Sequence, residues 1–183
     1  IEIKNSLDTD NIIEILPHAT NLAKFKNFFE IVINFYSENN FFYKVNDNGD
    51  TIFNIFAGRC KNIKVLECFY NTIKDSIIKD EEELKKFLLM KVGHLDKNVL
   101  LESIDFKNEV SFVFLFEQVF CKYFKINEIF SETDRNHENL LHKLALYGSV
   151  PVLELTLKKL KKELSHEEFQ NLVMKPIRKS SSI

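Results

Sequence analysis

A chain of 183 residues, 45% of them hydrophobic, is long enough to bury a substantial core and predicts one domain or one repeat array. Its 25 basic and 27 acidic side chains are mixed along the sequence and give a net charge of −2, which argues against general nucleic-acid binding. The longest apolar stretch, residues 110–116, is far shorter than the ~20 residues of a membrane-spanning helix, so no membrane insertion is expected.

The three cysteines, Cys60, Cys68 and Cys121, form no Cys-x-x-Cys pair. Their neighbours are largely apolar, which predicts small buried side chains in a reducing compartment. The first residues, Ile-Glu-Ile-Lys, do not have the pattern of a secretory signal. We therefore expect a cytoplasmic location, with nuclear import through the basic C-terminal region or delivery into a host cell as alternatives.

Turn-forming residues are scarce, because the chain has only four glycines and three prolines, and this scarcity predicts helices. Apolar residues recur at the helical spacing of three and four in several places. The stretches with this spacing are residues 28–35, 65–73, 110–120 and 152–160.

Each of these predicted helices follows a two-residue break whose second residue, Asn or Ser, can cap the coming helix. The breaks are Lys26-Asn27, Lys61-Asn62, Lys107-Asn108 and Gly148-Ser149. A shorter apolar stretch lies before each break. The chain is therefore predicted to contain about four irregular helix pairs, at residues 8–38, 46–75, 93–124 and 134–162.

Two further helices are expected outside these pairs. Residues 80–91 begin with acidic side chains and continue apolar, as a helix with charges matched to its N-terminal dipole would, and predict an inserted helix. Ser165 and Glu168 have the spacing of a capping box, which predicts a C-terminal capping helix at residues 163–175. Residues 1–183 are thus predicted to form a single all-α domain.

The last pair contains a specific motif with an Asp, a Leu-His pair, an Ala and a closing Gly. It reads Asp134-Arg135-Asn136-His137-Glu138-Asn139-Leu140-Leu141-His142-Lys143-Leu144-Ala145-Leu146-Tyr147-Gly148. This segment resembles an ankyrin repeat, and Gly49-Asp50-Thr51 has the Gly-x-Thr turn of the same family. The resemblance covers about residues 8–160 and implies an ankyrin-like helical-repeat solenoid, with HEAT or armadillo repeats as an alternative.

The chain departs from the ankyrin pattern where helices pack together. Asn54 and Leu101 stand where the family has His, and Phe56 stands where it has a small Ala. A Phe at a tight helix–helix contact is expected to make the stack looser and more irregular. The resemblance also implies that His142 ties its turn to the neighbouring repeat by hydrogen bonds.

Patterns for catalysis, cofactors and metals are weak. His137 and His142 would need two further zinc ligands that no nearby Cys provides. The acidic side chains of residues 80–83 occupy successive positions of a predicted helix and therefore point in different directions rather than toward one ion. The sequence contains no phosphate loop and no Gly-x-Ser-x-Gly motif. We therefore expect no enzyme activity, no cofactor and no metal.

The resemblance implies that turn tips and first-helix side chains form a concave face that binds another protein. The family's variable surface positions fall on Asp47, Asn48, Asp50, Arg59, His94, Lys97, Asp105, Phe106, Arg135, Asn136, Glu138, Leu146 and Tyr147. Phe106, Arg135 and Tyr147 are of the types that dominate interface energies. Packing of the two rings against an adjacent turn is an equally weighted alternative.

The function that the resemblance implies is that of an adaptor, decoy or inhibitor, as in the NF-kappa-B-binding ankyrin proteins. The alternative is a targeting or regulatory segment of a larger enzyme or channel, with the chemistry outside this chain. Self-association through the Phe-rich stripes is a third hypothesis, and the sequence predicts no particular oligomeric state.

Overall fold

The computed structural model describes residues 12, 14–35, 41–76, 78 and 80–174, and these residues are helical apart from loops and isolated β-bridges. The all-α prediction is confirmed for them. The 3-10 turns are η2 (Leu16–His18) and η3 (Phe41–Tyr43). The longer elements are α2 (Leu22–Phe35), α3 (Ile52–Arg59), α4 (Ile63–Ser76), α5 (Glu81–Leu89), α6 (Val99–Asp105), α7 (Glu109–Val113), the π-helix η4 (Phe114–Phe120), α8 (Cys121–Tyr123), α9 (Ile126–Ser131), α10 (Leu140–Tyr147), α11 (Val150–Glu163) and α12 (His166–Val173).

Side-chain caps explain where many of these helices begin. The predicted cap Asn108 accepts a hydrogen bond from the Ser111 N–H at the start of α7. The predicted capping box of α12 is present, with Ser165 and Glu168 bonded reciprocally. Ser149 stands at the predicted cap position of α11 but makes no capping hydrogen bond. The predicted inserted helix is α5, which is capped by Asp80.

The predicted break at Lys26-Asn27 is wrong, because α2 runs through it without interruption. Phe25, Phe29 and Val32 are buried on one face of the continuous helix, while Asn27 is exposed. A side-chain bond forms earlier, where the Asn21 Oδ1 accepts a hydrogen bond from the Lys24 N–H at 3.0 Å. Residues 8–11 and 36–38 of the first predicted pair lie outside the described residues, as does residue 175 of the predicted cap.

The apolar stripe predicted over residues 110–120 is also wrong in part. Val110, which was expected to be buried, is 40% exposed, whereas Phe112 and Phe116 are fully buried and stack with ring centres 5.4 Å apart. Val110 lies in α7, whereas the π-helix η4 begins at Phe114, and from there its wider turn changes the spacing at which side chains return to the same face. A stripe that assumes 3.6 residues per turn therefore does not match the buried face of the whole segment.

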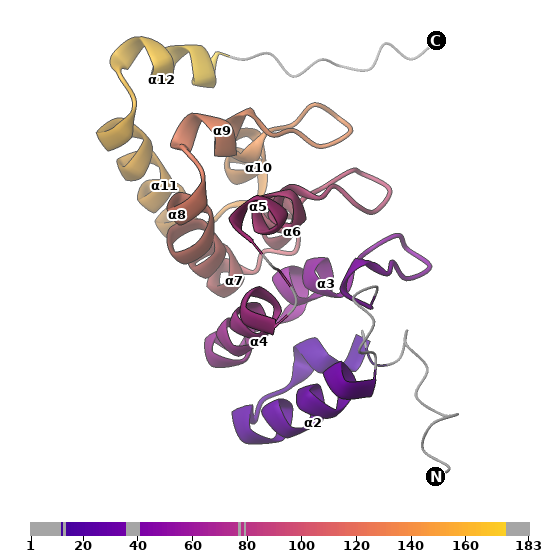
Figure 1. Cartoon of the computed structure of the whole chain (residues 1–183). Helices are drawn as coiled ribbons and strands as arrows, with labels where there is room; N and C mark the ends of the chain where they lie inside the picture. The colour runs from indigo at the N-terminus through magenta and orange to yellow at the C-terminus, as the bar shows by residue number, and fades with distance from the viewer. Residues whose placement is uncertain (1–11, 13, 36–40, 77, 79, 175–183) are drawn as a thin grey trace.

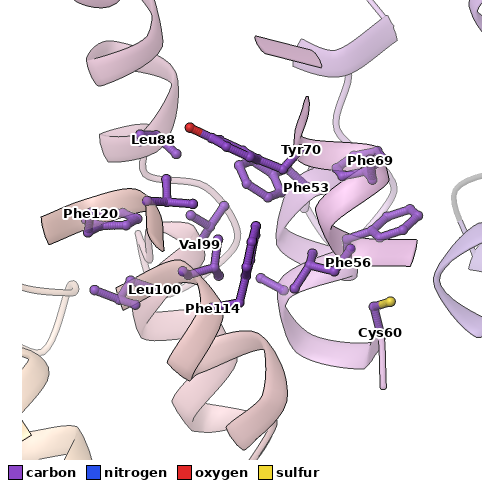
Figure 2. Packing of buried hydrophobic residues seen from close by; sticks show 14 of the residues in the cluster. Phe53, Phe56, Cys60, Phe69, Tyr70, Leu88, Val99, Leu100, Phe114 and Phe120 are labelled. Carbon is purple, nitrogen blue, oxygen red and sulfur yellow. The ribbon is translucent and has the colours of Figure 1, made fainter. Parts of the chain in front are cut away.

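The core is rich in phenylalanine, as Figure 2 shows. Phe56 of α3 lies face to face on Phe69 of α4, with ring centres 3.9 Å apart and planes inclined by 5°. Phe53 stacks on Phe87 at 5.5 Å, which fastens the inserted helix α5 to the α3–α4 pair. The fully buried phenylalanines are Phe25, Phe29, Phe53, Phe56, Phe69, Phe112, Phe116, Phe120 and Phe130. Most of the described phenylalanines in the Phe-rich stripes therefore pack inside the chain, whereas Phe28 is only partly buried.

The helices form successive pairs, α3 with α4, α6 with α7–η4–α8, and α10 with α11. In Figure 1 the second members of these pairs and α2 lie on one side of the molecule, and three loops project from the opposite side. Asn108 ties neighbouring pairs together, because its Nδ2 donates to the carbonyl oxygens of Ala57 (3.1 Å) and Cys60 (2.9 Å). None of the described helices has the length and apolar character needed to cross a membrane.

Candidate functional site

Three finger-like loops precede α3, α6 and α10 and project from the same side of the molecule (Figure 1). One antiparallel bridge closes each finger at its base. The bridges join Val45 to Thr51, Val92 to Lys97, and Thr133 to Asn139. We call residues 45–51, 92–97 and 133–139 the first, second and third finger.

The first and third fingers turn by the same side-chain arrangement. The Asn46 Oδ1 accepts hydrogen bonds from the backbone N–H groups two and four residues later, at 3.0 and 2.9 Å. The Asp134 Oδ1 accepts the equivalent pair at 2.8 and 3.0 Å. Such Asx turns hold the backbone of a loop without help from a sheet.

All three fingers have a left-handed residue at the same place, two residues before the N-cap of the following helix. These residues are Gly49 (φ 79°), Asp96 (φ 50°) and His137 (φ 62°). A glycine adopts this conformation without steric cost, whereas Asp and His do not. The fingers therefore share this left-handed position although their sequences differ.

Backbone hydrogen bonds join each finger to the next. The Gly93 N–H donates to the carbonyl oxygen of Gly49 at 2.8 Å, and the Arg135 N–H donates to that of Leu95 at 2.8 Å. The side chain of Asn54, which stands where the ankyrin pattern has His, donates to the carbonyl oxygen of Lys97 at 3.3 Å. The three fingers consequently form one connected row.

Two lysines, Lys97 at the base of the second finger and Lys143 in α10, hold a set of carboxylates, which we call the charge network. In its first part, Lys97 Nζ lies 2.6 Å from the Glu102 Oε2 and 3.1 Å from the Asp105 Oδ2. The Lys97 and Glu102 side chains are only 11% and 5% exposed. Pairs this well shielded from water interact far more strongly than pairs at the surface.

The second part of the charge network surrounds Lys143. Its Nζ lies 2.8 Å from the Asp134 Oδ2, 2.8 Å from the Glu138 Oε2 and 3.3 Å from the Asp105 Oδ1. Asp105 therefore bridges the two lysines and links α6 to α10 and the third finger. The Lys143 side chain is 3% exposed and that of Asp134 is fully buried.

Burial and charge pairing set the protonation of this network. Burial disfavours the charged form of Lys143, but hydrogen bonds to Asp134 and Glu138 outweigh it and raise the lysine pKa. Burial raises the pKa of Glu102, and its contact with Lys97 only partly opposes that shift. The lysines therefore stay charged, while Glu102 binds a proton more readily than an exposed glutamate.

Exposed apolar side chains lie beside this network, at the ends of α6 and α10. Phe106 is 46% exposed, Leu146 59% and Tyr147 43%. The Phe106 ring rests on α3, since a Cβ added at Gly58 would lie 3.0 Å from its Cγ. Lys97 Nζ lies 6.0 Å from the Phe106 ring centre, and Lys143 Nζ lies 5.8 Å from that of Tyr147.

The structure places the candidate residues from the sequence in different surroundings. Lys97, Asp105 and Glu138 belong to the mostly buried charge network, and Arg59 forms an ion pair with Glu14. Asp50 is half-buried in the first finger. The exposed group comprises Asp47, Asn48, His94, Phe106, Arg135, Asn136, Leu146 and Tyr147. Most of the candidate residues are thus exposed, while Lys97, Asp105 and Glu138 are tied up in the charge network.

Sequence reasoning missed Glu102, Asp134 and Lys143 as parts of this arrangement. A signal was present, because Glu102 and Lys143 each lie four residues after a capping asparagine, next to apolar residues of a short helix. A charged side chain in the middle of an apolar helix predicts a buried partner. His142 is the third residue of α10 and completes the capping box with the N-cap Asn139. Its Nδ1 accepts a hydrogen bond from the Asn139 N–H at 3.1 Å.

Two of the cysteines, Cys60 and Cys121, have thiols that burial makes less acidic. Burial raises the pKa of the Cys60 thiol and raises that of Cys121 to about 11. Since the thiolate is the reactive form, both thiols are poor nucleophiles at neutral pH. Within the part of the chain that the structure describes, no group of three His, Cys, Asp or Glu side chains is arranged to hold a metal ion.

Comparison with known proteins identifies no relative: no family model, no curated protein and no solved structure matches the chain.

Proposed function

We propose that this chain is a divergent ankyrin-like repeat protein that binds another protein through its fingers and the adjoining ends of α6 and α10. The recurrence of one finger design before α3, α6 and α10 supports the ankyrin-like assignment. The backbone hydrogen bonds from finger to finger support a continuous stack. The binding role makes the chain an adaptor, decoy or inhibitor rather than an enzyme, in the reducing cytoplasm, where its free cysteines stay reduced.

The observation that carries the binding proposal is a trio of exposed apolar side chains, Phe106, Leu146 and Tyr147, on a rigid support. Exposed aromatic and apolar side chains that are already ordered lose little conformational entropy when a partner covers them. The charge network supplies that order, because Lys97 and Lys143 hold the helix ends against the fingers. Arg135 in the third finger adds an exposed charged group to this side of the molecule, and its guanidinium donates to the carbonyl oxygen of His94 at 3.4 Å.

The test is affinity capture from cells followed by mass spectrometry, with wild-type chain and with the double variant Arg135→Glu and Tyr147→Ala as bait. Both residues are exposed, so the melting temperature should not change. Loss of one hot-spot aromatic typically costs ~2 kcal/mol or more, which corresponds to at least a ~30-fold weaker complex. We expect partners of the wild type to be lost from the double variant.

The matched control is Glu154→Ala with Lys158→Glu, which changes two exposed residues of α11 away from the fingers. This control should capture the same partners as the wild type. Equal capture by the Arg135 and Tyr147 double variant would move the binding site to another face of the molecule.

A further inference from the structure

A groove lies on the side of the molecule opposite the fingers, between α4 and the α7–η4–α8 helix. Its volume is about 670 Å³, and it is lined by side chains of these two elements. Its floor is an aromatic pair, Tyr70 and Phe114, whose ring centres lie 5.9 Å apart at an angle of 76° (Figure 2). Its rim is apolar at one end, where Ile63 and Val110 are 41% and 40% exposed.

Charges are ordered along this groove. Glu67 and Glu109 lie toward the beginnings of α4 and α7, whereas Lys74 and Lys122 lie toward the ends of α4 and α8. Glu117 lies between these two ends, and its charge also acts on Lys159 of α11. The groove therefore has an acidic end and a basic end.

This charge order selects the direction of a docked helix. A helix that runs antiparallel to α4 would place its N-terminus beside Lys74 and Lys122. Acidic residues are common in the first turn of a helix, and they would pair with these lysines. The positive end of the docked helix dipole would also face the negative C-terminal ends of α4 and α8.

Helix α12 has the acidic first turn and the exposed apolar side chains that such a docked helix needs. Its first turn carries Glu167 and Glu168, and none of its side chains is fully buried in its own chain. Val173 is 46% exposed and Met174, its C-cap, is 79% exposed. In the sequence, Lys175, Arg178 and Lys179 follow, so the segment changes from acidic to basic along its length.

Within one chain, α12 cannot occupy the groove. It packs against α11, with Phe169 and Leu172 partly buried on the core, and lies at the opposite end of the molecule from α4 (Figure 1). We propose that α12 of one copy docks antiparallel into the α4–α7 groove of a second copy. Glu167 then pairs with Lys74 and Lys122, and the exposed Met174 packs over the Tyr70–Phe114 floor, where its sulfur meets aromatic rings.

The contact joins two different surfaces, so it closes into a reciprocal dimer or continues as a chain of copies. An eight-residue helix buries less area than a standard stable interface, so the association is weak and depends on concentration. Its ion pairs are exposed, so it weakens as salt is raised from about 0.05 M to about 0.5 M.

Sedimentation velocity of the full 183-residue chain across concentration is the test, with two charge-reversed variants. The first is Lys74→Glu with Lys122→Glu in the groove, and the second is Glu167→Lys in α12. Each alone should associate at least tenfold more weakly than the wild type. An equimolar mixture should regain association, because the reversed groove of one variant meets the reversed α12 of the other, and the unchanged groove of the second meets the unchanged α12 of the first.

Circular dichroism of each variant checks that the helices are retained, since Lys122 and Glu167 are exposed and Lys74 is only half-buried. Lys26→Glu with Lys64→Glu, in the neighbouring groove between α2 and α4, is the matched control and should associate like the wild type. A wild-type chain that stays monomeric at the highest concentration overturns the proposal. A mixture of the two reversed variants that stays monomeric overturns it equally.

Discussion

Lys143 is a nearly buried cation within 3.3 Å of three carboxylates, and its removal is the most damaging single change we expect in the charge network. In Lys143→Met, Asp105, Asp134 and Glu138 lose their shared partner. Breaking a buried ion pair from one side costs roughly 3–5 kcal/mol of the free energy of unfolding. Urea unfolding followed by circular dichroism measures this loss.

The control for this prediction is Lys159→Met. Lys159 pairs with Glu163 at 2.8 Å, but both side chains are more than one third exposed. An exposed pair contributes about 0–1 kcal/mol, so this variant should remain close to the wild type. Equal losses in the two variants would mean that the charge network contributes no more than a surface pair.

Glu102 predicts a specific pH dependence of stability. Burial raises its pKa in the folded chain above the unfolded value, so the folded chain binds this proton more tightly. Its contribution to the free energy of unfolding therefore falls as pH rises from the unfolded pKa, about 4.3, through the folded pKa. Glu102→Gln removes this loss, so its stability relative to the wild type should increase between pH 4 and pH 7.

The contribution of Glu168 to stability should depend on pH in the opposite direction. Its bonds with Ser165 lower its pKa, so its contribution is present above the unfolded pKa and is lost as pH falls through the folded pKa. Glu168→Gln should therefore lose stability relative to the wild type as pH rises. Urea titrations at several pH values distinguish the two slopes, and parallel slopes would contradict the assignment of Glu102 as a carboxyl with a raised pKa.

At the scale of an element, substitutions at the equivalent left-handed positions of two fingers should change the free energy of unfolding in opposite directions. Gly49 has φ 79°, and an added Cβ would lie 3.2 Å from the Gly93 Cα in the next finger. Gly49→Ala should therefore reduce the free energy of unfolding by about 1–2 kcal/mol. His137 has φ 62° and a side chain, so His137→Gly should raise the stability by up to ~1 kcal/mol.

Thermal unfolding of both variants under one set of conditions measures this pair of effects. If Gly49→Ala and His137→Gly shifted the melting temperature in the same direction, the shared left-handed position would not be the cause. The comparison thus tests directly whether the fingers repeat one backbone design.

Elements that depend on local signals could be predicted from the sequence. The helix at Glu81–Leu89 has an acidic first turn, and the helix at His166–Val173 has a capping box, and both signals act within one turn. The continuity of α2 through Lys26-Asn27 could not be predicted in this way, because it depends on burial of Phe25 and Phe29 against other helices. No local pattern predicted the π-helix η4 either, and most of its residues are buried.

In the candidate site, too, some residues could be predicted from local motifs and others could not. The exposed finger residues Asn48, Arg135 and Asn136 follow from the turn motifs in which they occur. The charge network does not, because Lys97 and Asp105 are joined to Lys143 only when α6 and α10 are stacked. A sequence motif indicates which residues stand near a turn, whereas burial of a charge is a property of neighbouring elements.

At the scale of the whole molecule, one hydrophobic cluster runs from Ile12 to Leu160 across all the helix pairs. Its continuity means that no described pair has a separate core. The two proposed binding surfaces lie on opposite sides of this shared core, with the fingers on one side and the α4–α7 groove on the other (Figure 1). Binding at one surface therefore leaves the other accessible.

The same burial pattern predicts how stability is distributed. Every residue of α3 except Arg59 is buried, whereas no residue of α12 is. Amides of α3 and α6 should therefore exchange with solvent deuterium only through global unfolding, and those of α12 through local opening that costs much less free energy. Hydrogen exchange of the dilute chain at increasing urea measures this, since local opening depends little on denaturant. Helix α11, whose Val152, Thr156 and Leu160 are buried, is the internal control and should exchange with the core. If α12 exchanged as slowly as α3 in the dilute chain, it would be an integral part of the core and could not be available to a second copy.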